Sequence, residues 1–384
     1  MSEKQSGPVP ERANEPQILF LTLAKVDDRS FGGAIRSNDM RDALQQAGHV
    51  DTLVIHGASR FALDAAWDER RVKHATFGRG GLSLIALGQR RQIQAWVERT
   101  LAAKHYDVIV ARYLGLALFV QLKHCGRLVL DADDIFKTPP ASAAGSHLVR
   151  LKFALRNGVA AVLLRLARHV WVVNPRDGGR LPSRRTSQLP NAISLPALNP
   201  TRAPAVGGRV LMVGYFEHPP NAEGLQWFVE RVLPSLAVRF PCIELHAIGK
   251  HPPQFAERFS GPVSIRGFVD DLAKEYERAA LVIAPIRSGG GTQIKVLEAL
   301  AHGRPLVSSR FAHAGFAEHL VDEDHLLVAD AEAHWIDACV RILGHPTESE
   351  SLAARGLAAV RSHYGVEQMT RAIRQTIDDV VSRR

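Results

Sequence analysis

Cysteines are scarce in this sequence, and long apolar runs are missing. Its 384 residues include three cysteines, Cys125, Cys242 and Cys339, which lie far apart and form no CxxC or Cys/His cluster. This spacing excludes a disulfide framework and a zinc site, and it fits a reducing cytoplasm. No apolar stretch approaches the length of a membrane span, and residues 1–16 are polar and lack the apolar core of a signal peptide. We expect this N-terminal segment to be disordered and the protein to be cytoplasmic.

Acidic residues are nearly absent between residues 135 and 216. This segment has twelve lysines and arginines and one acid, Asp177, so its net charge is +11. The rest of the chain has 36 basic and 38 acidic residues, so the basic surplus is local. A local surplus of positive charge indicates binding to one defined anionic partner rather than non-specific binding to anionic surfaces. No interleaving of aromatic and basic residues points to nucleic acid, and we expect no nucleic-acid partner.

The chain is long enough for two domains, and its apolar pattern alternates between strands and helices. Short apolar runs separated by helical segments predict parallel sheets of the α/β class. In the second half we expect strands over 210–214, 243–249, 263–268, 281–285, 306–308 and 326–329. The expected helices include 114–125, 175–181 and 221–238. We expect an N-terminal domain over 17–191, a proline-rich linker over 192–207, a second domain over 208–364 and a final amphipathic helix over 365–384.

A glycine-rich loop between a strand and a helix is the most informative motif. An apolar strand is expected over 280–285, followed by a helix that begins near Thr292, which can cap its first turn. Between them lie three successive glycines, Gly289, Gly290 and Gly291. Such a loop brings backbone N–H groups and the positive end of a helix dipole to one point, which suits a phosphate group.

Charged residues accompany this loop. Arg287 precedes the glycines, and Lys295 and Glu298 follow on the expected helix. Lys295 can place a positive charge beside a diphosphate, and Glu298 can accept hydrogen bonds from ribose hydroxyls. The alternative is a tight Rossmann-type turn without a ligand, since the glycines match neither GxGxxG nor a P-loop. We favour phosphate binding, because a Lys and a Glu on a buried helix are otherwise unfavourable.

Two further candidate sites lie in the N-terminal half. Gly32 and Gly33 follow the first expected strand, where glycines either admit a ligand to the backbone or only allow a tight turn. Three aspartates, Asp131, Asp133 and Asp134, follow a later strand, at the edge where open α/β sheets bind ligands. For any single one of them, helix capping or solvent exposure is the alternative.

A long helix is expected over 146–168. Its spacing places four polar residues along one face: Arg150, Asn157, Arg165 and Arg168. This face is either simply solvated or in peripheral contact with an anionic membrane.

Together these motifs resemble the nucleotide-sugar-binding region of the family 4 (group 1) glycosyltransferases, which have the GT-B fold. Residues 209–236 look like the first strand and helix of that family's C-terminal domain, 265–272 like its nucleobase-facing turn, and 188–193 like its hinge-side turn. The resemblance implies two Rossmann-like domains facing each other across a cleft, with the C-terminal helix returning to the N-terminal domain.

The resemblance also implies roles for individual residues. Catalytic roles fall on Asp133, where many relatives carry a histidine, and on Lys295, while Gly32 and Gly33 would line the cleft. Donor-binding roles fall on Arg287, Gly289, Gly290, Gly291, Thr292, Lys295, Glu298 and Phe268.

The implied reaction moves a sugar from a nucleotide-sugar donor to a glycan, lipid-linked or other acceptor, with retention of configuration. The implied context is cell-surface polysaccharide or glycoconjugate synthesis, with no cofactor. We expect no metal, because backbone N–H groups and Lys295 would stabilise the leaving diphosphate.

Two departures from the family pattern keep other functions open. Gly290 stands eight residues before Glu298, where many relatives have a glutamate, and residues 215–221 lack the usual Arg and Lys. One alternative is a catalytically silent GT-B protein that binds a nucleotide sugar or a partner, which these departures support and the presence of Lys295 and Glu298 opposes. A nucleotide-sugar epimerase is a third alternative, for which we identify no additional acid/base set.

Overall fold

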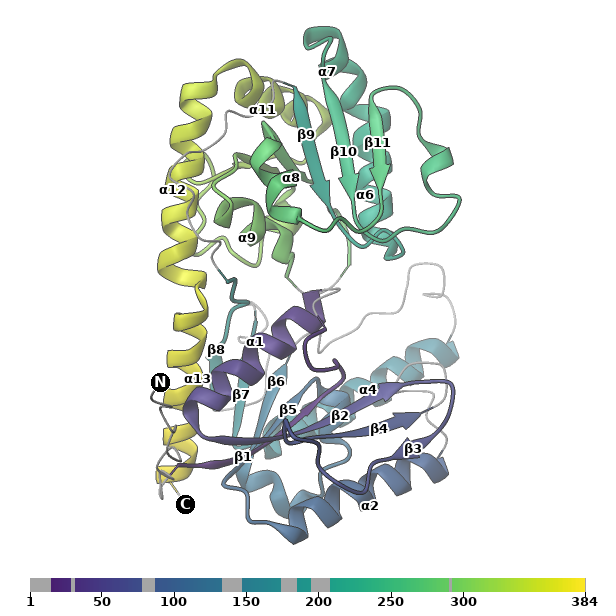
Figure 1. Cartoon of the computed structure of the whole chain (residues 1–384), viewed down its shortest axis with the longest axis vertical. Helices are drawn as coiled ribbons and strands as arrows, with labels where there is room; N and C mark the ends of the chain where they lie inside the picture. Colours follow the sequence, from purple (N-terminus) through teal and green to yellow (C-terminus); the bar gives the residue numbers. More distant parts are fainter. Residues whose placement is uncertain are drawn as a thin grey trace, which may run out of the picture.

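The computed structural model contains two sheets built mainly from parallel strands, one in each half of the chain (Figure 1). The structure describes residues 15–28, 32–77, 87–132, 147–173, 185–194, 208–289 and 292–383. Several expectations lie outside these residues: most of the disordered N-terminus and of the linker, a short helix over 175–181, and Asp133, Asp134, Gly290 and Gly291.

The N-terminal sheet has the strand order β3-β4-β2-β1-β5-β6-β7-β8. All of its neighbouring strands run parallel except β3 and β4. Its strands are Gln17–Thr22 (β1), His49–Gly57 (β2), Ala62–Leu63 (β3), Val72–Phe77 (β4), Val108–Arg112 (β5), Leu128–Ala132 (β6), His169–Val172 (β7) and Thr186–Gln188 (β8). The central strands are continuous apolar runs because helices cover both faces of the sheet.

The helical elements of this half are Gly32–Ala47 (α1), Leu87–Ala103 (α2), Leu114–Ala117 (α3), Leu122–Arg127 (η2, a 3-10 helix) and His147–Leu166 (α4). The prediction of one helix over 114–125 is wrong. The chain leaves the helix after α3, and Gln121 is extended with ψ 151°. Phe119 and Val120, which lie between the two short helices, are both buried in the core.

The C-terminal sheet is parallel throughout, with the order β11-β10-β9-β12-β13-β14. Its strands are Arg209–Val213 (β9), Glu244–Ile248 (β10), Val263–Arg266 (β11), Leu281–Ala284 (β12), Leu306–Ser308 (β13) and Leu327–Val328 (β14). All six match expected strands.

The helices around this sheet are Pro219–Arg231 (α6), Leu233–Arg239 (α7), Ala256–Arg258 (η4, a 3-10 helix), Leu272–Arg278 (α8), Ile294–Ala301 (α9), Arg310–His313 (α10), Glu332–Gly344 (α11) and Pro346–Tyr364 (α12). One helix was expected over 221–238, but Pro234 divides it. Proline has no N–H to donate within a helix, so it occupies the first turn of α7 instead.

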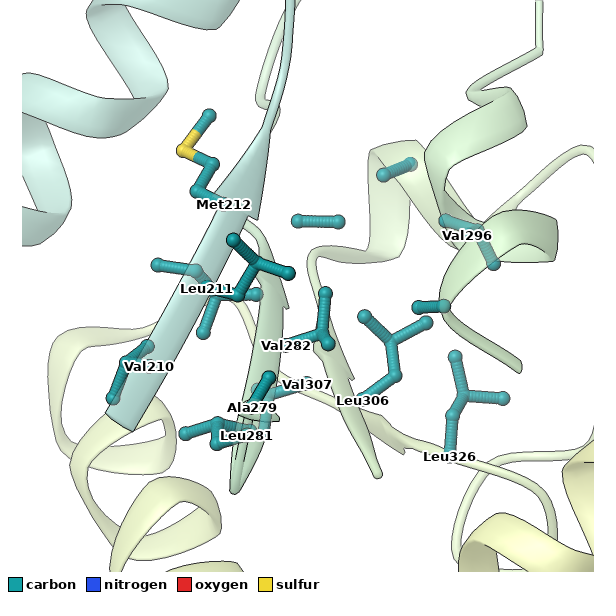
Figure 2. Close-up of a cluster of buried hydrophobic side chains, with 14 of the residues drawn as sticks. Val210, Leu211, Met212, Ala279, Leu281, Val282, Val296, Leu306, Val307 and Leu326 are labelled. Atoms are coloured by element: carbon teal, nitrogen blue, oxygen red, sulfur yellow. The ribbon is translucent and has the colours of Figure 1, made fainter. Parts of the chain in front are cut away.

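The expected strand, loop, helix and strand unit around the glycines is confirmed as β12, α9 and β13. β12 and β13 pair in parallel, with Val282 opposite Leu306. Figure 2 shows the core beneath this unit, where Val282, Leu306 and Val307 meet Val296 of α9 and Leu211 of β9. These side chains are almost completely buried, so they anchor the start of α9 at the carboxyl edge of the sheet.

The last helix, Val366–Ser382 (α13), returns to the N-terminal sheet as expected. It continues from α12 across both halves of the molecule and packs beside α1 (Figure 1). The indole Nε1 of Trp171 donates to Thr376 Oγ1 at 3.0 Å. Met369, Ile373, Ile377 and Val380 of α13 share a core with Ile18 and Phe20 of β1.

Helices of membrane-spanning length and hydropathy do not occur within the described ranges.

Candidate functional site

The first turn of α9 has no side-chain cap. The N-cap residue is Gln293, and its side chain accepts no hydrogen bond from the helix. The expected cap, Thr292, instead accepts a hydrogen bond from Asn191 Nδ2. The chain approaches this turn through Gly289, whose φ of +114° favours glycine. An uncapped helix start after such a loop leaves N–H groups that suit an anionic ligand.

Lys295 lies in this first turn, close to the carboxyl end of β9. Its Nζ donates to Asn221 Oδ1 at 2.5 Å, and Asn221 in turn donates to Tyr215 O at 2.8 Å. A Cβ at Gly214 would lie 3.5 Å from this Nζ, so bare backbone passes beside the ammonium group. Burial lowers the pKa of Lys295 to about 8, although the Glu298 carboxylate opposes the shift. Lys295 is therefore a cation that would gain from an added anion.

Glu298 lies one turn further along α9. It accepts a hydrogen bond from the Tyr276 hydroxyl at 3.3 Å, and burial raises the pKa of its carboxyl group. The Tyr276 ring stacks on His302, with centroids 4.4 Å apart. The Glu298 carboxylate can therefore accept hydrogen bonds in addition to the one from Tyr276. Its contact with the ribose hydroxyls stays a prediction.

The other expected donor-side residues are more exposed. The Arg287 guanidinium lies 4.9 Å from the centre of the Trp227 ring, on the side of α6. Phe268 follows β11 and is 67 % exposed. An exposed aromatic ring at the carboxyl end of a parallel strand can stack on a planar base.

The glycine pair of the N-terminal half lies against α9. A Cβ at Gly32 would lie 3.1 Å from Ile294 Cδ1, so the start of α1 and the start of α9 meet across the domains. The carbonyl oxygen of Gly33 accepts from Ser37 Oγ at 2.8 Å. The two halves of the candidate site are thus in direct contact.

Asp131 corrects one expectation. It was expected among carboxylates at a ligand-binding edge, but its side chain is fully buried and paired with Arg36 and Arg112 at 2.6 and 2.5 Å. Burial opposes ionisation, yet the two guanidinium groups hold the pKa of Asp131 below its usual value. Asp131 is therefore occupied within the fold. Within the described ranges, no three His, Cys, Asp or Glu side chains gather to hold a metal ion.

Lys250 is a basic residue that the sequence did not single out. It follows β10, and its carbonyl oxygen accepts from Phe216 N at 2.7 Å. Its Nζ lies 3.3 Å from Glu217 Oε2, and Glu217 also accepts from the Tyr215 hydroxyl. A neighbouring strand thus brings a cation to the loop that lacks the family's Arg and Lys. The sequence does not show that Lys250 lies near this loop, because their proximity depends on the pairing of β9 with β10.

Solved structures of the same shape are numerous. They include sucrose-phosphate synthase from Thermosynechococcus elongatus, at 18 % identity and a TM-score of 0.74 over 96 % of this chain and 100 % of that one. Trehalose 6-phosphate synthase from Burkholderia multivorans follows at 16 % identity and 0.67, over 96 % and 98 %. HepE of Anabaena, solved with UDP and glucose, has 17 % identity and 0.64, over 95 % and 100 %. At these low sequence identities, the structural similarity establishes the fold alone, and that fold is GT-B.

A family model described as glycosyl transferases, group 1, matches residues 207–345. This range contains the C-terminal sheet and all of α9. The chain has the GT-B fold and contains, over residues 207–345, a glycosyltransferase domain that is similar to the group 1 enzymes. Among curated proteins, no match was found.

Proposed function

We propose that this protein is a family 4 glycosyltransferase that moves a sugar from a nucleoside diphosphate sugar to a sugar-containing acceptor. The observation that carries the proposal is the position of Lys295 in the uncapped first turn of α9, directly after the glycine loop. UDP is the first nucleotide to consider, because HepE, which shares the fold, was solved with UDP.

In this proposal the diphosphate lies at the start of α9. Its oxygens accept from N–H groups at the start of α9 and replace Asn221 Oδ1 as the partner of Lys295 Nζ. Negative charge that develops on the leaving diphosphate as the glycosidic C–O bond breaks is then stabilised by groups already in position. The acceptor oxygen forms the new bond on the same face of the sugar, and its proton passes to the leaving phosphate. Retention and metal independence are parts of this proposal.

The rest of the donor is proposed to follow the carboxyl edge of the C-terminal sheet. Glu298 would accept from the ribose hydroxyls, with Tyr276 fixing its orientation. The Phe268 turn would face the base, and Arg287 and Lys250 are placed to contribute positive charge. Asp133 stays a proposed acceptor-side residue.

We further propose a lipid-linked or other membrane-bound acceptor, reached at the cytoplasmic face of an anionic membrane. Three large apolar residues of α4 lie on its exposed face at spacings of three and four: Val159, Val162 and Leu166, of which Val162 is 53 % exposed. Arg165 is exposed beside them, and Leu122 of the adjacent η2 is 67 % exposed. Apolar side chains flanked by basic ones suit an anionic membrane surface.

Calorimetric titration with UDP, GDP and ADP tests donor binding. We expect the wild type to bind one of them and Lys295→Ala to bind it about ten- to a hundredfold more weakly, as for loss of a charge-assisted hydrogen bond. Lys274→Ala is a matched control, because Lys274 lies on the exposed side of α8 beside Asp271. Equal affinity of a folded Lys295→Ala variant would contradict the assignment.

A silent binding protein remains the second candidate, since Gly290 stands where many relatives carry a glutamate. Incubation with the nucleotide sugar that binds best separates the two. A transferase releases nucleoside diphosphate slowly to water and faster with an acceptor, whereas a silent protein releases none.

A further inference from the structure

One guanidinium group joins the N-terminal sheet to the segment that leads out of it. Arg36 donates to both carboxylate oxygens of Asp131, at 3.1 and 2.6 Å. The same side chain donates to Leu189 O at 2.8 Å, to Pro190 O at 2.9 Å and to Asn191 Oδ1 at 3.1 Å. The turn Leu189–Asn191 is thereby fixed to β6.

The other end of the Asn191 amide reaches the opposite domain. Nδ2 donates to the hydroxyl of Thr292, immediately before α9. The methyl group of Thr292 packs against Gly315, where a Cβ would lie 2.5 Å from Cγ2. Thr292 is therefore held by its hydroxyl from one domain and by its methyl group from the other.

The orientation of this amide is determined by its partners. Arg36 has only donors, so the oxygen of Asn191 must face it and the NH2 group must face Thr292. Asn191 is almost completely buried, at 5 % exposure. A buried amide with both ends engaged has no alternative orientation that keeps both hydrogen bonds.

We infer that Asn191 is a positioning residue, which holds Thr292 so that the start of α9 is preorganised for the diphosphate only when the two domains are correctly placed. This inference rests on the proposed function. Thr292 lies directly before the N-cap of α9, so its release would loosen the start of this helix, and ordering it again would reduce the affinity for the diphosphate. Donor affinity is thereby coupled to the buried Arg36–Asp131 pair of the acceptor domain.

A double-mutant cycle on Asn191 and Thr292 tests this coupling. UDP affinity is measured by calorimetry, with GDP and ADP in parallel, for Asn191→Ala, Thr292→Val and the double variant. Loss of one neutral hydrogen bond corresponds to about a three- to tenfold weaker affinity. We expect each single variant to show this loss and the double variant to lose no more than either, because both remove the same contact.

Two controls separate this coupling from general destabilisation. Thr292→Ser keeps the hydroxyl and should retain most of the wild-type affinity. Thr376→Val removes a similarly buried threonine hydroxyl that accepts from Trp171, and it should leave the affinity unchanged. Should Asn191→Ala fail to fold, Thr292→Val and Thr292→Ser still decide the matter.

Unchanged or higher affinity in Thr292→Val, or additive losses in the double variant, would overturn the inference while the proposed function stands. A wild type that binds none of the three nucleotides would instead contradict the proposed function, and this inference with it.

Discussion

The ammonium nitrogen of Lys295 lies 2.5 Å from the amide oxygen of Asn221, in a setting that lowers the lysine pKa to about 8. An amide oxygen has only a partial negative charge, so it neutralises only part of the positive charge on the lysine ammonium group. An incoming diphosphate would therefore meet a cation that is poorly neutralised, and binding would raise the lysine pKa again.

The pH dependence of nucleotide binding follows from this relationship. Lys295 has a pKa of about 8, so it is mostly charged at pH 7 and UDP affinity should fall by only about twofold between pH 7 and 8. Above that range the free protein must take up a proton to bind, and affinity should fall by up to about tenfold per pH unit. Calorimetry from pH 7 to 10 checks this, with Lys274→Ala following the wild type. A flat profile would exclude a role for charged Lys295.

Glu298→Gln should weaken nucleotide binding and leave the fold intact. The amide keeps the shape of the side chain and can still accept from Tyr276, but it is a weaker acceptor for two ribose hydroxyls. We expect a loss of about 1 kcal/mol in UDP affinity. The 2′-deoxy analogue dUDP supplies the control, because its affinity should differ less between variant and wild type. A variant that folds with reduced stability but binds UDP as tightly as the wild type would make Glu298 a purely structural residue.

Transfer should not require a divalent metal ion. The charge on the leaving diphosphate is assigned to Lys295 and the start of α9, which together need no metal ion. Donor turnover is measured in excess EDTA and then after addition of magnesium or manganese. Equal rates are expected, and activity that disappears with EDTA and returns with metal would contradict the proposal.

Co-sedimentation with vesicles tests the α4 surface. We expect binding to vesicles that contain anionic lipid, loss of that binding at high salt, and no binding to neutral vesicles. The variant with Arg150, Arg165 and Arg168 changed to Gln should bind more weakly, as should Val162→Ser with Leu166→Ser. Changing Arg231, Arg239 and Arg258 of the other domain to Gln is the matched control. Equal recovery from anionic and neutral vesicles would leave α4 as an ordinary solvated helix.

Local patterns predicted the parts of the fold that depend on neighbouring residues. The apolar run of β12, the glycine loop and the amphipathic α9 were recognisable because each lies within a few residues. The same holds for α13, whose apolar face repeats at helical spacing. Pro234 can also be recognised in the sequence as a residue that interrupts a helix. Its place in the first turn of α7, however, depends on how the chain turns after α6.

The parts that escaped prediction depend on residues far apart in the chain. Asp131 looked like a ligand-binding carboxylate because Arg36 and Arg112 reach it only after the sheet has formed. β4 was missed because the six residues VKHATF gain strand character from pairing with β2. Lys250 lies beside Glu217 because β10 pairs with β9, and Asn191 reaches Thr292 only because the two domains are in contact.

The return of α13 to the N-terminal sheet has a consequence for how this protein is made. Four of its side chains complete a core whose other members lie before residue 193. A growing chain translated from its N-terminus thus carries an incomplete first domain until Val366–Ser382 has emerged. The second domain, whose core draws on residues up to Tyr364, can close first, so the domain synthesised first is the last to finish folding.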